Sequence, residues 1–173
     1  MTAGSRRHAF VETTLGELLL VADGEALAGL YFPKHWHPPK EADIGERVEE
    51  NADPLIAEAA RQVREYLAGS RRDFDVPVST HGDEFSERVW ALLRQIPYGQ
   101  TTTYGALAER LGGKRLAQRV GQAVGHNPVS IVIPCHRVVG ADGSLTGFAG
   151  GLARKRALLE LEEPAEVRAG RLF

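Results

Sequence analysis

Hydrophobic and polar residues alternate over short runs at the start of the chain. The stretch HAFVETTLGELLLVADGEALAGLYF, residues 8–32, is interrupted at Thr-Leu-Gly and at Asp-Gly, which are typical of hairpin turns. This pattern predicts short strands in an antiparallel arrangement. The polar, proline-containing stretch that follows, residues 34–54, predicts an irregular surface loop.

From Asp53 onwards the apolar residues recur with a helical period instead. Asp53 is a typical N-cap, Pro54 a typical first helical residue and Gly69 a typical residue after the last turn. One apolar stripe joins the positions Ile56, Ala60, Val63 and Leu67. This pattern predicts an amphipathic helix between Asp53 and Gly69. The segment RRDFDVPVS, residues 71–79, predicts a final strand.

Beyond residue 80 the pattern is mainly helical. Apolar faces predict three helices, within residues 82–99, 101–113 and 114–128. The last two are short and meet at a pair of glycines, which is typical of a helix-turn-helix. SIVIP, residues 130–134, predicts a short β-type run, and LARKRALLELE, residues 152–162, predicts a last helix.

Together these elements predict an α+β fold with two domains. Residues 1–80 are expected to form a small N-terminal α/β domain, an antiparallel sheet with one helix. Residues 81–173 are expected to form a mainly helical domain that carries the helix-turn-helix. A chain of 173 residues suits two small domains that share a core.

The composition is that of an ordinary soluble globular protein, with 25% charged and 43% hydrophobic residues. No apolar run approaches the ~20 residues that cross a bilayer, so no membrane partner is expected. The beginning, MTAGSRRHAF, has no apolar segment after its two arginines and does not resemble a secretory signal. A single cysteine excludes an internal disulfide, and the cytoplasm is the expected location.

Charge is distributed unevenly along the chain. Residues 1–80 carry 9 basic and 14 acidic side chains, whereas residues 81–160 carry 10 basic and 6 acidic ones. Residues 110–137 contain five basic side chains and no Asp or Glu, namely Arg110, Lys114, Arg115, Arg119 and Arg137. This run is either a solvated basic face or a surface that binds a polyanion such as nucleic acid.

The only cysteine, Cys135, is followed directly by His136. It is either a buried filler residue or a reactive thiol. A reactive thiol needs its surroundings to favour the thiolate, and a histidine can provide this help. On an extended segment, however, neighbouring side chains point to opposite sides, so a direct hydrogen bond between the two is awkward. A water molecule or a third residue that reorients the imidazole would solve this problem.

Three stretches of the chain resemble the O6-alkylguanine-DNA alkyltransferase family. NPVSIVIPCHRVVG, residues 127–140, is similar to the active-site segment, in which P-C-H-R surrounds the alkyl-accepting cysteine. FSERVWALLRQIPYGQTTTYGALAERLG, residues 85–112, is similar to the helix that leads into the family's helix-turn-helix. GSLTGFAGGLARKRALLELE, residues 143–162, is similar to the active-site loop and the helix after it. The combination is specific because N-P precedes P-C-H-R and T-G-x-x-G-G follows it.

The resemblance implies a ribonuclease-H-like N-terminal domain and direct-reversal DNA repair. The substrate would be O6-alkylguanine, and less readily O4-alkylthymine, in double-stranded or single-stranded DNA. Because the alkyl group lies in the base stack, the nucleotide must be flipped out, at a cost of roughly a few kcal/mol. The alkyl group would then pass irreversibly to Cys135, so one molecule repairs one lesion. No cofactor is implied, and the protein is expected to be a monomer; cooperativity on DNA is left open.

The resemblance also implies a catalytic set. Cys135 accepts the alkyl group, His136 acts as general base through a water, Glu162 orients His136, and Asn127 braces the active-site turn. Glu162 has the alternative of being an exposed carboxylate at a helix end, and Tyr104 that of being a core aromatic residue. For the substrate base the implied pocket comprises Tyr104, Val138, Phe148, Ala149 and Gly150. For DNA the implied contacts are Tyr104, Gly105, Gly113, Lys114, Arg115, Gln118 and Arg119.

The chain departs from the family pattern at three positions. Gln118 stands where family members carry an arginine that fills the gap left by the flipped base, and Arg119 lies about 100° further around the helix. Either residue remains a candidate for the gap. Phe148 replaces a common tyrosine. Ser130 stands where one relative has a proline that packs on bulky O6 groups, which implies weak sensitivity to O6-benzylguanine.

Two other classes of protein are alternatives to an alkyltransferase that repairs DNA. Alkyltransferase-like proteins bind such lesions without reacting, but they replace the acceptor cysteine. A helix-turn-helix transcription regulator would usually be a dimer on paired half-sites, and it leaves the thiol motif unexplained. A fusion with a further metal-binding regulatory domain would need more cysteines. His35 and His37 alone do not form a ligand set, so no structural metal is expected.

Overall fold

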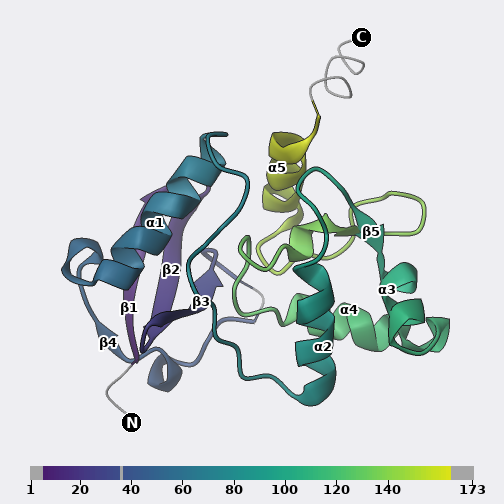
Figure 1. The fold of residues 1–173 in the computed structure, drawn as a ribbon, viewed down its shortest axis with the longest axis horizontal. Helices are drawn as coiled ribbons and strands as arrows, with labels where there is room; N and C mark the ends of the chain where they lie inside the picture. Colours follow the sequence, from purple (N-terminus) through teal and green to yellow (C-terminus); the bar gives the residue numbers. More distant parts are fainter. Residues whose placement is uncertain (1–5, 36, 165–173) are drawn as a thin grey trace. The chain divides into compact units, whose positions relative to one another are not determined.

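Three antiparallel strands follow one another as the alternating pattern predicts (Figure 1). They are β1 (Arg6–Thr13), β2 (Gly16–Asp23) and β3 (Ala26–Tyr31). The fold is taken from a computed structural model, which describes residues 6–35 and 37–164. Helix α1 (Pro54–Leu67) packs on this sheet, and the helix and the strands both contribute fully buried side chains, among them Leu20 and Ile56.

Helix α1 begins where the sequence predicts. The Asp53 carboxylate accepts hydrogen bonds from the backbone N–H groups of Leu55 and Ile56, at 3.0 and 3.1 Å. Pro54 occupies the first helical position, where no N–H is needed. The chain leaves the helix at Gly69, whose φ of 84° favours glycine.

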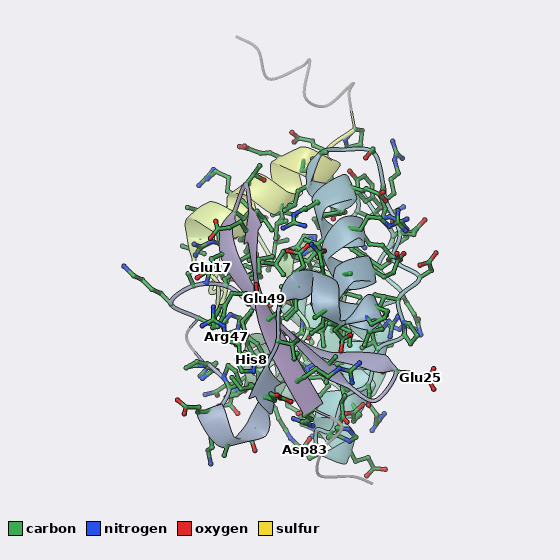
Figure 2. All side chains as sticks on the ribbon, turned by 90° about the vertical axis from the view of Figure 1, so that its left-hand side faces the viewer. His8, Glu17, Glu25, Arg47, Glu49 and Asp83 are labelled. Carbon is green, nitrogen blue, oxygen red and sulfur yellow. The ribbon has the colours of Figure 1, made fainter. Side chains whose placement is uncertain are left out.

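The polar stretch after β3 is more regular than predicted. It contains two short 3₁₀ helices, η1 (Glu41–Asp43) and η2 (Glu50–Ala52), and between them the strand β4 (Glu46–Arg47). β4 runs parallel to β1, so the sheet is mixed, with the order β3-β2-β1-β4. His8 and Arg47, both labelled in Figure 2, are partners in this pairing. A strand of two residues carries no hydrophobic period, which explains why the pattern missed it.

The strand predicted at residues 71–79 is wrong. Only Val78 makes an isolated bridge, to Leu27, and the rest of that stretch is irregular. The chain divides into two compact units, Met1–His81 with Pro128–Val132, and Gly82–Asn127 with Ile133–Phe173.

The described part of the second unit, up to residue 164, contains four α-helices, as predicted. They are α2 (Glu84–Leu93), α3 (Tyr104–Leu111), α4 (Ala117–Gly125) and α5 (Leu152–Glu162). Asp83, labelled in Figure 2, caps α2 by accepting from the Ser86 N–H at 2.7 Å. Gly112 and Gly113, with φ of 136° and 150°, make the turn of the helix-turn-helix, followed by η3 (Lys114–Leu116).

The β-type run predicted at residues 130–134 is also wrong. This stretch forms turns, and Ile131 has a φ of 72°, a left-handed conformation that is strained for a β-branched residue. The Ser130 N–H donates to the Leu30 carbonyl at 3.2 Å, so the chain touches β3 and then reverses. Tertiary pairing has overridden the local preference of Ile, Val and Ile for an extended strand.

Within residues 6–35 and 37–164, no helix has the length and apolar character that a membrane span requires.

Candidate active site

Cys135 lies on a tight turn instead of an extended segment. It opens η4 (Cys135–Arg137), and its N–H donates to the Ile133 carbonyl at 2.7 Å. Successive residues of a 3₁₀ helix are about 120° apart, so Cys135 and His136 need not point to opposite sides. The geometric objection to their cooperation therefore does not apply. The Cys135 side chain is nearly buried, with 5% of the residue exposed.

Asn127 closes the turn that carries the thiol. Its side-chain Nδ2 donates to the Ile133 carbonyl oxygen at 2.8 Å, and the residue is buried. The bond joins the residue before the 128–132 turn to the residue after it. Asn127 therefore lies where a brace for the active-site turn has to be.

His136 and Glu162 form a buried pair. His136 Nε2 lies 2.8 Å from Glu162 Oε2, and both residues are inaccessible to solvent or nearly so. The alternative of an exposed carboxylate at the end of α5 is therefore wrong. Since a carboxylate only accepts, Nε2 carries the proton and Nδ1 is the nitrogen with the lone pair.

Arg137 is a member of this cluster that the sequence reasoning missed. Its Nε and Nη2 donate to Glu162 Oε1 and Oε2, each at 2.8 Å, and its Nη1 donates to the Ile96 carbonyl at 2.6 Å. The guanidinium lies 5.7 Å from the centre of the Tyr98 ring. Arg137 is buried, so its assignment to the basic surface run was wrong.

The surroundings of His136 favour the neutral imidazole. Burial lowers its pKa from the ordinary value of 6.5, because the charged ring would lose its hydration. Glu162 opposes this effect, whereas the positive charges of Arg137 and Lys155 reinforce it. At neutral pH His136 is therefore a base that can accept a proton.

Lys155 is a second residue that the sequence reasoning missed. It is fully buried on α5, and its Nζ donates to the Thr146 carbonyl at 2.8 Å. Burial lowers its pKa to about 8, while the negative charge of the Cys135 thiolate acts in the opposite direction. The signal was its spacing, because Lys155, Leu158 and Glu162 form the buried face of α5. A lysine on the buried face of a helix is rare and points to a function.

Tyr104 lies beside one wall of the expected base pocket. It is the first residue of α3 and directly follows β5 (Thr102–Thr103), which pairs in parallel with β6 (Val138–Val139). Its hydroxyl accepts a hydrogen bond from Thr146 Oγ1 at 3.2 Å, and the residue is half-buried. The alternative of a core aromatic residue is therefore wrong.

The remaining pocket residues precede α5. Phe148, Ala149 and Gly150 are buried, and the Gly151 N–H donates to the Phe148 carbonyl at 2.8 Å. They are near Lys155 in the sequence, and Thr146 of the same loop contacts both Lys155 and Tyr104.

The residues expected to contact DNA lie on α3, η3 and α4. Lys114, Arg115 and Gln118 are exposed, and Gly105 and Gly113 are half-buried. Arg119 has a stacking partner, because its guanidinium lies 4.0 Å from the centre of the Phe85 ring on α2. Gln118 is therefore the one of the two candidates that faces solvent without this stacking partner.

Two protein-family models match this chain, one in each half. The model of the 6-O-methylguanine DNA methyltransferase ribonuclease-like domain matches residues 7–80. The model of the DNA binding domain of the same methyltransferase matches residues 84–164.

Curated relatives and solved structures agree with these matches. A methylated-DNA–protein-cysteine methyltransferase of Mycobacterium tuberculosis is 42% identical over 161 residues, covering 91% of this chain and 94% of the relative. One of Methanosarcina acetivorans is 41% identical over 155 residues, covering 90% and 97%. The crystal structure of Mycobacterium tuberculosis OGT in complex with DNA has a TM-score of 0.79 at 39% identity, covering 93% of this chain and 97% of that chain.

Proposed function

The chain belongs to the 6-O-methylguanine DNA methyltransferase family, and we propose that it repairs DNA by moving an alkyl group from guanine O6 to Cys135. Transfer to O4-alkylthymine is expected to be slower. The observation that carries the proposal is the buried set of Cys135, His136 and Glu162 on the turn that Asn127 closes. The reaction consumes the protein, because no group in this set can hydrolyse a thioether.

The chemistry follows from the orientation of these groups. His136 Nδ1 accepts the Cys135 proton through a water molecule, while Nε2 keeps its hydrogen bond to Glu162. The sulfur then attacks the alkyl carbon, so that an S–C bond forms and the C–O6 bond breaks. The electron pair of the broken bond stays on the guanine, and the Ala149 amide donates to O6 as this charge develops.

The lesion reaches the thiol by base flipping. Lys114 and Arg115 provide phosphate contacts that tolerate any sequence, and Tyr104 presses on the phosphate 3′ of the lesion. The flipped base lies between Val138 and the Phe148–Gly150 segment. We further propose a cytoplasmic monomer that acts on duplex and single-stranded DNA.

Repair should need neither a metal nor another cofactor. Among the residues that the structure describes, no three His, Cys, Asp or Glu side chains are grouped as metal ligands would be. Burial lowers the pKa of His35 to about 4, and its ring stacks on Phe32, as expected of a packing residue. Stoichiometric zinc in elemental analysis of the purified protein would contradict this part of the proposal.

Intact-protein mass spectrometry tests the function directly. After incubation with an O6-methylguanine oligonucleotide, the protein is expected to gain the mass of one methylene group on Cys135, once per molecule. Cys135→Ser should bind the same oligonucleotide and gain no mass. Tight binding by the wild type without any mass gain would favour a lesion-binding protein that does not react.

The position of Arg119 predicts how the gap in the DNA is filled. Because Arg119 stacks on Phe85, Gln118 should enter the gap, and its smaller amide stabilises the flipped state less than an arginine would. Lesions in duplex DNA should therefore react more slowly than lesions in single strands. Gln118→Arg is expected to raise the duplex rate about tenfold and to leave the single-strand rate unchanged.

Arg119→Gln serves as the matched variant, measured on both substrates. A large loss of duplex rate in Arg119→Gln, together with no gain in Gln118→Arg, would show that Arg119 is the residue that enters the stack.

A further inference from the structure

The carboxylate of Glu162 is shared between a base and a cation. His136 Nε2 and Arg137 Nη2 both lie 2.8 Å from Oε2, and Arg137 Nε lies 2.8 Å from Oε1. All three residues are buried, with at most 7% of any of them exposed. A buried carboxylate with two different partners has to divide its charge between them.

This sharing of the Glu162 carboxylate affects the protonation of His136. The effect is clear from a comparison with a histidine beside a buried carboxylate that has no other partner. Such a pair favours the proton on the imidazole, since the resulting ion pair removes an isolated negative charge from the interior. Arg137 already supplies the balancing positive charge to Glu162. A second proton on His136 would then create a positive ring beside a carboxylate that Arg137 already neutralises, and close to the positive guanidinium of Arg137.

Among the described residues, the other groups packed around His136 add no second carboxylate that would favour the imidazolium. From η4 the ionisable neighbours are Cys135 and Arg137, and from α5 they are Lys155 and Glu162. Helix α2 also packs on η4, and its buried residues Val89, Trp90 and Leu93 carry no charge. Lys155 adds a positive charge, which further disfavours the imidazolium.

Arg137 is also held firmly enough to fix the carboxylate. Its third donor, Nη1, is bonded to the Ile96 carbonyl, and its flat face lies near the ring of Tyr98. The Tyr98 hydroxyl in turn donates to the Leu161 carbonyl at 3.3 Å, next to Glu162. The fork of the guanidinium therefore sets the plane of the carboxylate, which a lysine with a single ammonium group cannot do.

We propose that Arg137 is a positioning residue for alkyl transfer: it orients and neutralises Glu162, so that His136 rests uncharged and accepts the Cys135 proton only when the thiol reacts. This inference rests on the proposed function of Cys135 as the acceptor. Arg137 acts through Glu162 and His136 and touches neither the thiol nor the alkyl group in this role.

The pH dependence of Cys135 alkylation distinguishes a positioning role of Arg137 from a merely structural one. The rate at which iodoacetamide alkylates Cys135 is measured from pH 4 to 9 for the wild type and for the variants R137Q, E162Q and R137Q/E162Q. Without Arg137 the acid limb of the profile should move to higher pH by about one unit, so that the rate at pH values below the wild-type limb falls about tenfold. In the double variant the charges balance again, and the limb should return to the wild-type position.

Two further variants control for charge and for packing. R137K keeps the positive charge, so its limb should stay in place while the rate falls at every pH through the lost second hydrogen bond. R156Q removes an exposed arginine of α5 and should change nothing. A uniform loss of rate in R137Q without a shift of the limb, or the same shift in R137Q and the double variant, would overturn the proposal.

Nuclear magnetic resonance tests the wild type itself, and a variant serves only to assign the signal. The His136 ring, assigned with the variant H136Q, should show a neutral imidazole with the proton on Nε2 at pH 7. A protonated ring at that pH overturns the proposal. Because iodoacetamide needs no DNA, a failure of this inference is distinguishable from a failure of the repair function, which the mass measurement tests.

Discussion

Glu162→Ala is expected to be the most damaging single substitution outside the thiol itself. It leaves the Arg137 guanidinium buried without its carboxylate and His136 without its partner. Breaking a buried ion pair from one side costs about 3–5 kcal/mol of the free energy of unfolding. Alkyl transfer should also slow by about 10²–10⁴-fold, which is the usual contribution of an oriented general base.

Denaturant unfolding and the rate of transfer to Cys135 together check this expectation. Glu160→Ala is the matched control, since it removes an exposed carboxylate two residues away on the same helix. The control should leave the unfolding midpoint and the transfer rate within error of the wild type. Equal effects of the two substitutions would show that the buried contacts of Glu162 carry little energy.

Lys155→Met is expected to make the protein more stable and less active at the same time. Burial lowers the Lys155 pKa from 10.5 to about 8, so the charged form costs up to about 3 kcal/mol below pH 8. The lost hydrogen bond to the Thr146 carbonyl offsets about 1 kcal/mol of this gain. Alkyl transfer should fall about tenfold or more, because the lysine charge no longer stabilises the Cys135 thiolate.

The pH dependence of stability identifies the cause. The unfolded chain holds the Lys155 proton up to about pH 10.5, whereas the folded protein releases it near pH 8. The unfolded state therefore binds more protons between these values, and this group makes the free energy of unfolding rise with pH there. Below pH 8 the penalty is fully present. Lys155→Met should lack the rise between pH 8 and 10.5.

Arg156→Met provides the comparison, because it removes one positive charge from an exposed position beside Lys155. Its unfolding curve should keep the wild-type slope with pH. A loss of stability in Lys155→Met at pH 7 would mean that the Thr146 contact outweighs the cost of burying the charge.

Much of the fold follows from local pattern, and the errors share one physical origin. The hairpin strands and the helices α1 to α4 follow the periods of their apolar residues, and Asp53 and Gly69 mark the ends of α1; these predictions are confirmed. The strand β4, the single bridge at Val78 and the turn at Ile131 depend on partners far away in the chain. No window of the sequence contains those partners.

The active site shows the same difference between features that depend on nearby residues and features that depend on distant partners. The motif around Cys135 points to the thiol, to His136 and to Asn127, because these lie within a few residues of one another. The bonds from Arg137 to Glu162 span 25 residues and become visible only when α5 is in place. Arg119 was ambiguous for a similar reason, since its partner Phe85 belongs to another helix.

The grouping of Pro128–Val132 with the N-terminal strands has a consequence for protein engineering. A fragment cut at the apparent boundary near residue 80 would keep Cys135 and every member of its charge cluster. It would nevertheless lose Leu30, which accepts from the Ser130 N–H, donates to the Pro128 carbonyl and bridges to Val129. The alkyl-accepting half therefore cannot simply be transferred to another protein. A fusion protein would have to include β3 or provide another strand that pairs with residues 128–130.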